Sequence, residues 1–332
     1  MEIDVRVEHL PLRAPVRITG YTFIEVPVIV VELRDGEYVG RGEAAGIYYR
    51  NESPQRMMSQ IEAIWPVLEA GGDRSMLAHL LLPGGARNAL DCALWDLDAK
   101  RAGKPAWQLA GLEAPIPKVT TFTLGADAPD AMAEQARAWS QARALKLKLT
   151  GEPIDAERVR AVRAARPDVW LGVDANQGYD VGSLRNMLPA FVEADVRLIE
   201  QPVPPALDGG LPALQSPIPI AGDESVLCLA DLPRCVGRFD AINIKLDKCG
   251  GLTEGLAMAR VAKRLGFKVM VGNMGGSSLA MAPGFLLAQL CDLVDLDGPL
   301  VLATDRAPRV SYENGHLSCP DSLWGAAVAT RP

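Results

Sequence analysis

The chain has 332 residues, 48% of them hydrophobic, and its 34 basic and 41 acidic side chains give a net charge of −7. This length suits one large domain and a smaller one. Because no Lys/Arg cluster is present, we expect no nucleic-acid partner.

The six cysteines form no CxxC pair and only three histidines are present, so we predict reduced thiols in a cytoplasmic protein and no zinc site. The acidic N-terminus lacks the apolar region of a signal peptide. The most apolar helical stretch, 279–290, contains Pro283 and Gly284 and is shorter than the about 18 residues of a membrane span. We expect no membrane partner, and a homo-oligomer stays open.

The first 47 residues are predicted to form a small antiparallel sheet. Residues 26–33 are rich in β-branched side chains, and Asp35-Gly36 is a hairpin turn signal. Two loops of this region are rich in aromatic residues, namely 17–23, with Gly20, Tyr21 and Phe23, and 46–50. Their side chains either anchor the loops or form a lid over a pocket.

Residues 54–111 change to a helical pattern. Apolar side chains recur on one helix face from Ala89 to Leu97, and Gly103 and Pro105 end that helix. We interpret this part as scaffold that completes an α+β capping domain over residues 1–112.

The rest of the chain alternates short apolar runs with helical patterns. We place eight strands at about 118–124, 145–149, 169–174, 197–200, 218–222, 240–245, 268–272 and 293–296. Helices are expected at 129–143, 155–166, 182–194, 253–265 and 277–290. The predicted fold class is α/β, a modified (β/α)8 TIM-type barrel over 113–305 with the N-terminal capping domain. The segment 306–332, with a turn signal at Asn314-Gly315, is expected to return to that domain.

Charged residues end successive strands of the predicted barrel. In 144–149, alternation places Lys146 and Lys148 on one strand face, which is also typical of an edge strand protected by lysines. Spacings of 26, 26, 23 and 22 residues separate the members of the series Lys148, Asp174, Glu200, Asp223 and Lys245. A βα unit has about this length, so each unit brings one charge to the same end of the barrel.

Three carboxylates without His or Cys form a hard oxygen site that favours Mg²⁺. Taken singly, Asp174 or Asp223 could cap a helix and Glu200 could pair with an arginine. Together in successive barrel units, Asp174, Glu200 and Asp223 are candidate metal ligands.

A metal beside buried lysines points to proton abstraction next to a carboxylate. Burial near a second ammonium and a cation would favour neutral Lys148, a usable base. Removing the α-proton creates an enediolate, which the metal and Lys146 would stabilise. Lys245, from the opposite side, could return the proton to the other face, as racemisation or epimerisation requires. A Schiff-base aldolase would also use a barrel lysine, but it gives no reason for three convergent carboxylates.

The set of motifs resembles the enolase superfamily, muconate-lactonizing-enzyme subgroup, over essentially the whole chain. The motifs are Lys146-Leu147-Lys148, Asp174-Ala175-Asn176, Glu200-Gln201-Pro202, Asp223-Glu224-Ser225, the run from Lys245 to Gly251 and the cap helix from Arg87 to Leu97. Enolase-superfamily enzymes are a known case of a lysine base working with a Mg²⁺-stabilised enediolate. The resemblance implies an isomerase in which Lys148 and Lys245 are the acid/base pair.

Within the subgroup, residues 295–299 resemble the dipeptide epimerases, the relatives of L-Ala-D/L-Glu epimerase. The resemblance implies a dipeptide substrate whose ammonium binds Asp295 and Asp297, with Thr123 and Met274 as pocket walls. Relatives that act on a C-terminal glutamate tend to carry a basic residue in the first cap loop, where this chain has Gly20, Tyr21 and Phe23 with Arg17 as the nearest cation. At the C-terminal position of the dipeptide, glutamate and an uncharged or aromatic residue therefore both stay open.

Two alternatives also stay open. An N-acylamino acid racemase or a cycloisomerase of the same subgroup would act on substrates without a free ammonium. A barrel kept only for binding would be catalytically silent, although both lysines and all three carboxylates are present.

Overall fold

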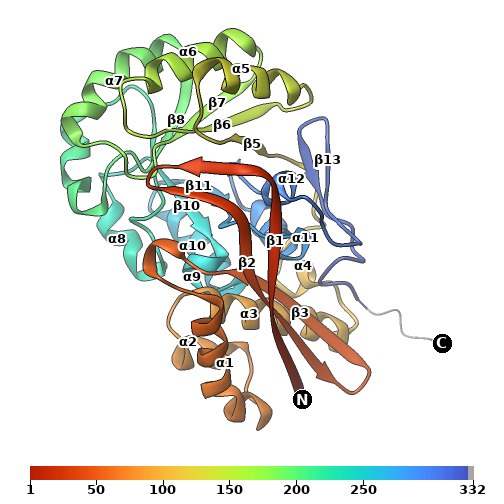
Figure 1. Cartoon of the computed structure of the whole chain (residues 1–332). Helices are drawn as coiled ribbons and strands as arrows, with labels where there is room; N and C mark the ends of the chain where they lie inside the picture. Colours follow the sequence, from red (N-terminus) through yellow and green to blue (C-terminus); the bar gives the residue numbers. More distant parts are fainter. Residues whose placement is uncertain (328–332) are drawn as a thin grey trace.

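The computed structural model describes residues 1–327 and begins with a three-stranded antiparallel sheet. Its strands are β1 (Glu2–Ile18), β2 (Tyr21–Asp35) and β3 (Tyr38–Ala45), in the order β1-β2-β3. The turn between β2 and β3 confirms the hairpin predicted at Asp35-Gly36. Figure 1 shows the opposite end of this sheet, where β1 turns into β2, bending toward the barrel.

Helices complete the N-terminal part of the chain. They are η1 (Tyr48–Arg50), α1 (Pro54–Glu69), α2 (Arg74–Leu80), α3 (Gly85–Ala102) and α4 (Ala106–Leu109). The side chains of Ser53 and Asp73 cap α1 and α2. Helix α3 lies so close to β3 that a Cβ atom on Gly42 would come 2.0 Å from the carbonyl oxygen of Ala89. This sheet and these helices enclose a separate hydrophobic core that includes Val31, Ile61 and Leu90.

Eight parallel strands form the barrel, in the spatial order β12-β11-β10-β9-β8-β7-β6-β5. They are β5 (Thr121–Leu124), β6 (Ala144–Lys148), β7 (Trp170–Asp174), β8 (Val196–Glu200), β9 (Ile220–Gly222), β10 (Ala241–Lys245), β11 (Lys268–Gly272) and β12 (Leu293–Val294). The longer helices are α5 (Pro129–Ala138), α6 (Asp155–Ala165), α7 (Val181–Glu193), α10 (Leu252–Arg264) and α11 (Ser278–Ala288). Shorter ones are η2 (Pro205–Leu214), η3 (Leu229–Asp231), α8 (Leu232–Cys235), α9 (Leu246–Cys249) and α12 (Gly298–Val301). The predicted barrel fold is confirmed.

Two predicted elements differ from the structure. The strand expected at 118–124 is split, because β4 (Lys118–Val119) pairs with β14 (His316–Ser318) and only β5 joins the barrel. The helix expected to reach residue 143 ends at Ala138, and the carbonyl of Trp139 accepts a hydrogen bond from Arg166 instead of continuing the helix.

Side chains close the barrel where β5 faces β12, since no backbone ladder joins these two strands. The Thr120 hydroxyl donates to the carbonyl of Val294 (3.3 Å) and accepts from the amide of Leu296 (3.0 Å). Beyond them, Thr121 donates to Asp295, and the amide of Thr123 donates to Asp297 at 2.6 Å. The first and last strands of the barrel are therefore held together by hydrogen bonds of polar side chains.

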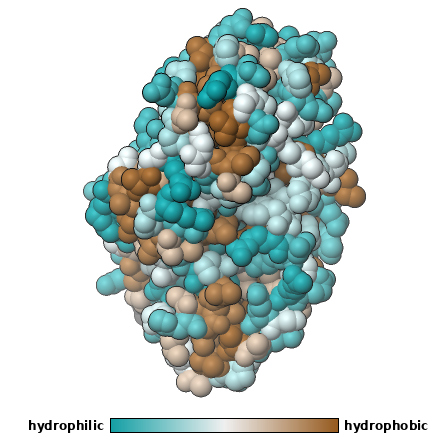
Figure 2. Space-filling view, turned by 90° about the vertical axis from the view of Figure 1, so that its left-hand side faces the viewer, coloured by the Kyte–Doolittle hydropathy of each residue, from teal (hydrophilic) through white to brown (hydrophobic). Residues whose placement is uncertain are grey.

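The C-terminal segment contacts both parts of the molecule. β13 (Ser311–Glu313) and β14 (His316–Ser318) form a small sheet with β4. Trp324 donates to the carbonyl of Arg41 at 2.9 Å, and the amide of Gly325 donates to Asp96 at 2.7 Å. Within residues 1–327, no helix has the length and apolar character needed to cross a membrane. On the face shown in Figure 2, hydrophobic residues gather in several separate groups.

Buried polar contacts join the cap to the barrel. Asp247 of α9 accepts from the amide of Ala45 (3.0 Å) and from the Asn88 side chain (3.1 Å) of the cap. Burial raises the pKa of Asp247 from 3.8 to about 7, although the Asn88 hydrogen bond opposes this. Asp91 of α3 similarly accepts from the amide of Thr253 at 2.9 Å. The cap–barrel interface therefore contains a carboxyl group that binds a proton more tightly in the folded state.

Replacing Asp247 by Asn should make the protein less sensitive to rising pH. The folded state binds this proton more tightly than the unfolded state, so the wild type loses stability as pH rises from about 4 through 7. The side-chain amide oxygen of the Asp247→Asn variant can accept the same two hydrogen bonds, but it does not titrate. Urea unfolding at about pH 5 and about pH 8 gives the free energy of unfolding of the variant and of the wild type. We expect the difference, variant minus wild type, to be larger at about pH 8 by at least about 1 kcal/mol. Parallel stability profiles would contradict this assignment.

Candidate active site

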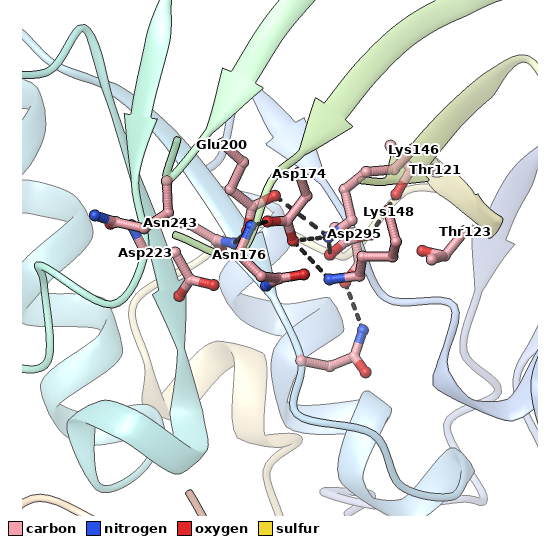
Figure 3. A network of polar contacts seen from close by, with 12 residues as sticks. Thr121, Thr123, Lys146, Lys148, Asp174, Asn176, Glu200, Asp223, Asn243 and Asp295 are labelled. Carbon is pink, nitrogen blue, oxygen red and sulfur yellow. Dashed lines mark hydrogen bonds and ion pairs between the residues drawn. The ribbon is translucent and has the colours of Figure 1, made fainter. Parts of the chain in front are cut away.

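The charged residues predicted from strand spacing meet at the carboxyl ends of the barrel strands. Figure 3 shows side chains of this site converging from neighbouring strands, among them Lys148, Asp174 and Glu200. They come from β6 (Lys146, Lys148), β7 (Asp174), β8 (Glu200), the residue after β9 (Asp223), β10 (Lys245) and the residues after β12 (Asp295, Asp297). This end is where barrel enzymes carry their active sites.

Three buried carboxylates form a candidate metal centre. One oxygen from each of Asp174, Glu200 and Asp223 lies within 4.8 Å of the others, and none of the three residues is more than 1% exposed. Burial, with the nearby charge of Asp174, raises the pKa of Glu200 to about 8. Carboxylates this close need positive charge, and an all-oxygen donor set fits a hard divalent cation.

Lys148 and Lys245 approach this cluster from opposite sides. Lys148 lies 2.6 Å from Asp174, and Lys245 lies 2.6 Å from Asp223. Their strands, β6 and β10, are separated by β7, β8 and β9, which place them across the eight-stranded barrel from each other. Two ammonium-bearing side chains therefore face one shared space.

The charge on Lys245 is set by more than burial. Burial does lower the pKa of Lys245, but the carboxylates, with Asp223 first and Glu200 next, together raise it well above its ordinary value. Lys245 is therefore held as an ammonium by the same carboxylates that form the candidate metal centre.

Lys146 is surrounded by carboxylates. Its ammonium pairs with Asp295 and lies 3.3 Å from Glu200 and 3.8 Å from Asp174. Burial lowers the pKa of Lys146, and these carboxylates raise it well above its ordinary value. Lys146 is thus a fixed positive charge between the metal centre and the end of β12.

Asp295 and Asp297 have different surroundings although both line the same cavity. Burial opposes ionisation of Asp295, but Lys146 and Thr121 lower its pKa. Burial and then the charge of Asp295 raise the pKa of Asp297, whose neighbours include the amide of Thr123. Lys146, which is already paired with Asp295, opposes this rise in the pKa of Asp297 without cancelling it.

A cavity of about 380 Å³ lies between the cap and the barrel mouth. Thr123, Met274 and Phe23 line it, as do all three site lysines. Gly20 and Tyr21 do not line it, although the Tyr21 ring lies 4.6 Å from that of Tyr48. Of the loop residues named from the sequence, Phe23 thus lies on the cavity wall, whereas Gly20 and Tyr21 lie outside the cavity.

The turn between β1 and β2 is attached to the barrel by Thr19. Its hydroxyl lies 3.0 Å from the carbonyl oxygen of Leu149, beyond β6, and 2.8 Å from that of Ala175, beyond β7. The following strand then brings Phe23 onto the cavity wall.

Many of the cavity residues were not named as site residues from the sequence, and they include Tyr48, Tyr49, Asn176 and Glu224. Tyr49 Oη, Asn176 Oδ1 and Glu224 Oε2 are buried without a hydrogen-bond partner among the described residues. Asn176 and Glu224 belong to motifs already recognised, directly beside Asp174-Ala175 and Asp223. The two tyrosines lie in the aromatic loop 46–50, but only the folded chain shows that they reach the cavity. Unpartnered buried polar atoms beside a cavity indicate a ligand site.

Two family models match most of the chain. The mandelate racemase / muconate lactonizing enzyme N-terminal domain matches residues 1–111. The enolase C-terminal domain-like model matches residues 131–328.

Curated relatives match over nearly the full length. An L-Ala-D/L-Glu epimerase from Escherichia coli (strain K12) is 39% identical, covering 95% of this chain and 98% of that protein. An N-acetyl-D-glutamate racemase from Pseudoalteromonas sp is 40% identical, covering 90% of this chain and 96% of that protein. Relatives of similar identity thus differ in whether the named substrate has a free amino group.

Solved structures share the fold. An enolase family member from Agrobacterium tumefaciens with homology to dipeptide epimerases, with bound sodium and L-Ala-L-Glu, is 41% identical with a TM-score of 0.94 and covers 97% of this chain and 99% of that chain. A dipeptide epimerase from Methylococcus capsulatus, complexed with Mg and L-Arg-D-Lys, is 31% identical with a TM-score of 0.87 and covers 95% and 96%.

Replacing Glu200 by Gln should weaken binding of a divalent cation while the fold survives. The change removes one charged oxygen ligand and keeps the size of the side chain, so we expect a loss of Mg²⁺ affinity of at least about tenfold. Isothermal titration with MgCl₂ measures this directly. Glu193→Gln is the control, because that side chain is 62% exposed and pairs with Arg160. Equal affinity in Glu200→Gln and wild type would contradict the metal centre.

Proposed function

This chain belongs to the mandelate racemase / muconate lactonizing enzyme family of the enolase superfamily, and on this premise we propose that it is a metal-dependent dipeptide epimerase. The reaction inverts the α-carbon of the C-terminal residue. The observation that supports it most strongly is the placement of Lys148 and Lys245 across the barrel from each other, with three buried carboxylates between them.

The two lysines can exchange protons with opposite faces of one carbon. Lys148 and Lys245 each lie 2.6 Å from a different carboxylate of the cluster, so both side chains reach the same small space. One neutral lysine removes the α-proton as the C–H electron pair passes into the substrate carboxylate. The other lysine, as its ammonium, donates a proton to the opposite face of the α-carbon. The product differs from the substrate only in configuration, and the protons balance.

Fixed positive charge favours this proton transfer. Mg²⁺, when held by Asp174, Glu200 and Asp223, would neutralise charge that develops on the substrate carboxylate. Lys146 is buried beside Glu200 and Asp174 and keeps its positive charge next to the same region. Because this charge is already in place before the reaction, little reorganisation is needed in the transition state.

Asp295 and Asp297 would bind the ammonium of the N-terminal residue. Both line the cavity at the end of β12, and Asp295 is already paired with Lys146. Asp297 is buried beside a like charge, so a substrate ammonium would supply the opposite charge that it lacks. This pairing favours a free dipeptide over an N-acylated amino acid.

Two wider predictions belong to the same proposal. All six cysteines are free thiols, as is usual in a reducing compartment, and we propose a cytoplasmic location. A homo-oligomer stays open as an alternative to a monomer.

Replacing either Lys148 or Lys245 by Ala should stop epimerisation. Removal of either group breaks the proton path in both directions, and a positioned acid or base typically contributes about 10²- to 10⁴-fold. Each variant can still exchange the α-proton of one epimer with D₂O, because the remaining lysine serves one face. Proton NMR separates exchange from inversion, with Lys263→Ala on the exposed end of α10 as control. Normal epimerisation by Lys245→Ala would require a one-base mechanism.

Replacing Asp297 by Asn should lower kcat/KM for dipeptides by about one and a half decades or more. Removing one partner of a desolvated charge pair typically costs about 2–5 kcal/mol, at about 1.4 kcal/mol per decade. N-acetylated dipeptides should be poor substrates of the wild type, and the substitution should affect them less because they carry no ammonium. Equal turnover of acetylated and free dipeptides would support the N-acylamino acid racemase instead.

A further inference from the structure

We infer that the epimerised residue carries an uncharged side chain, aromatic or aliphatic, and that Phe23 excludes glutamate from this position. The inference rests on the proposed function and specifies its substrate class. This substrate class differs from that of the relatives whose names include glutamate, and it follows from the residues that line the cavity of this chain.

The cavity has no cation free to meet a substrate side-chain carboxylate. Among the described residues that line it, the only cations are the three site lysines, and each is paired with a buried carboxylate. Arg17, the cation nearest to the first cap loop, is exposed and does not line the cavity. A glutamate side chain would therefore enter the cavity without a partner of opposite charge.

Acidic residues add to this exclusion. Glu25, Glu52 and Glu224 line the cavity, and none of them forms an ion pair with Lys or Arg among residues 1–327. Glu25 pairs only with His9, and Glu52 accepts from the amides of Ile47 and Gly85. An additional carboxylate in this space would be desolvated and repelled.

The cap side of the cavity is instead aromatic and aliphatic. The ring of Phe23 lies 5.1 Å from that of Tyr48, which lies 5.2 Å from that of Tyr49. Ile18 and Val26 of the cap also line the cavity, as does Met274 from the barrel. With the α-carbon between Lys148 and Lys245 and the ammonium at Asp297, this wall is the part of the cavity left for the side chain of the C-terminal residue. Apolar contact with it would be favourable for an aromatic or aliphatic side chain.

The test compares L-Ala-L-Phe, L-Ala-L-Leu and L-Ala-L-Glu with the Mg²⁺-loaded enzyme, measuring kcat/KM for epimerisation. We expect each of the first two to exceed L-Ala-L-Glu by about a hundredfold or more, the range typical of an unpaired buried charge. Phe23→Arg should supply the missing cation, raising kcat/KM for L-Ala-L-Glu about tenfold or more and lowering it for L-Ala-L-Phe.

Ile24→Arg is the matched control, because it adds the same charge at the next residue of β2, where the side chain is 67% exposed and does not line the cavity. It should leave the substrate ratio unchanged. A wild-type preference for L-Ala-L-Glu would overturn the inference and leave the proposed function intact, and this ratio decides the matter without any variant. Absence of α-proton exchange with every member of an L,L-dipeptide library would instead contradict the proposed function itself.

Discussion

The site depends on balancing the charge of carboxylates that are buried together at the barrel mouth. Asp174, Glu200 and Asp223 are almost fully shielded from solvent and lie within one small cluster. Such a group is stable only beside positive charge, and in this fold neighbouring lysines supply it, namely Lys146, Lys148, Lys245 and Lys248. The proposed acid/base groups and the candidate metal ligands are therefore one electrostatic unit, in which a change at one member alters the charge state of the others.

The cap supplies most of the apolar surface of the cavity. The lysines and carboxylates cover the floor of the cavity, but apolar surface comes mainly from the hairpin of β1 and β2 and from the loop that contains Tyr48 and Tyr49. Buried contacts of Asp247 and Asp91 hold the cap on the barrel. The barrel thus carries the proposed reacting groups, and the cap carries the surface proposed to contact the side chain of the substrate.

The sequence allowed prediction of the barrel and its charged residues because each of them ends a short apolar run at a regular spacing. The spacing of the charged residues from Lys148 to Lys245 matches the length of the βα repeat. The topology of the barrel alone therefore brings their side chains together at one end. The protonation of Lys245 could not be predicted in this way, since it depends on distances to carboxylates from other strands. Nor could Tyr21 and Phe23 be separated, because alternation gives both the same strand face, and only the bend of the hairpin decides which one reaches the cavity.

The hydroxyl of Thr19 shares its one proton between two carbonyl oxygens of the barrel and so joins the turn between β1 and β2 to the site. Leu149 directly follows Lys148, and Ala175 directly follows Asp174, so the turn that precedes Phe23 is attached to the backbone beside a proposed base and a candidate metal ligand. A change of side chain at position 23 therefore acts close to the groups proposed to move the proton, and its effect can extend to the rate of proton transfer as well as to affinity.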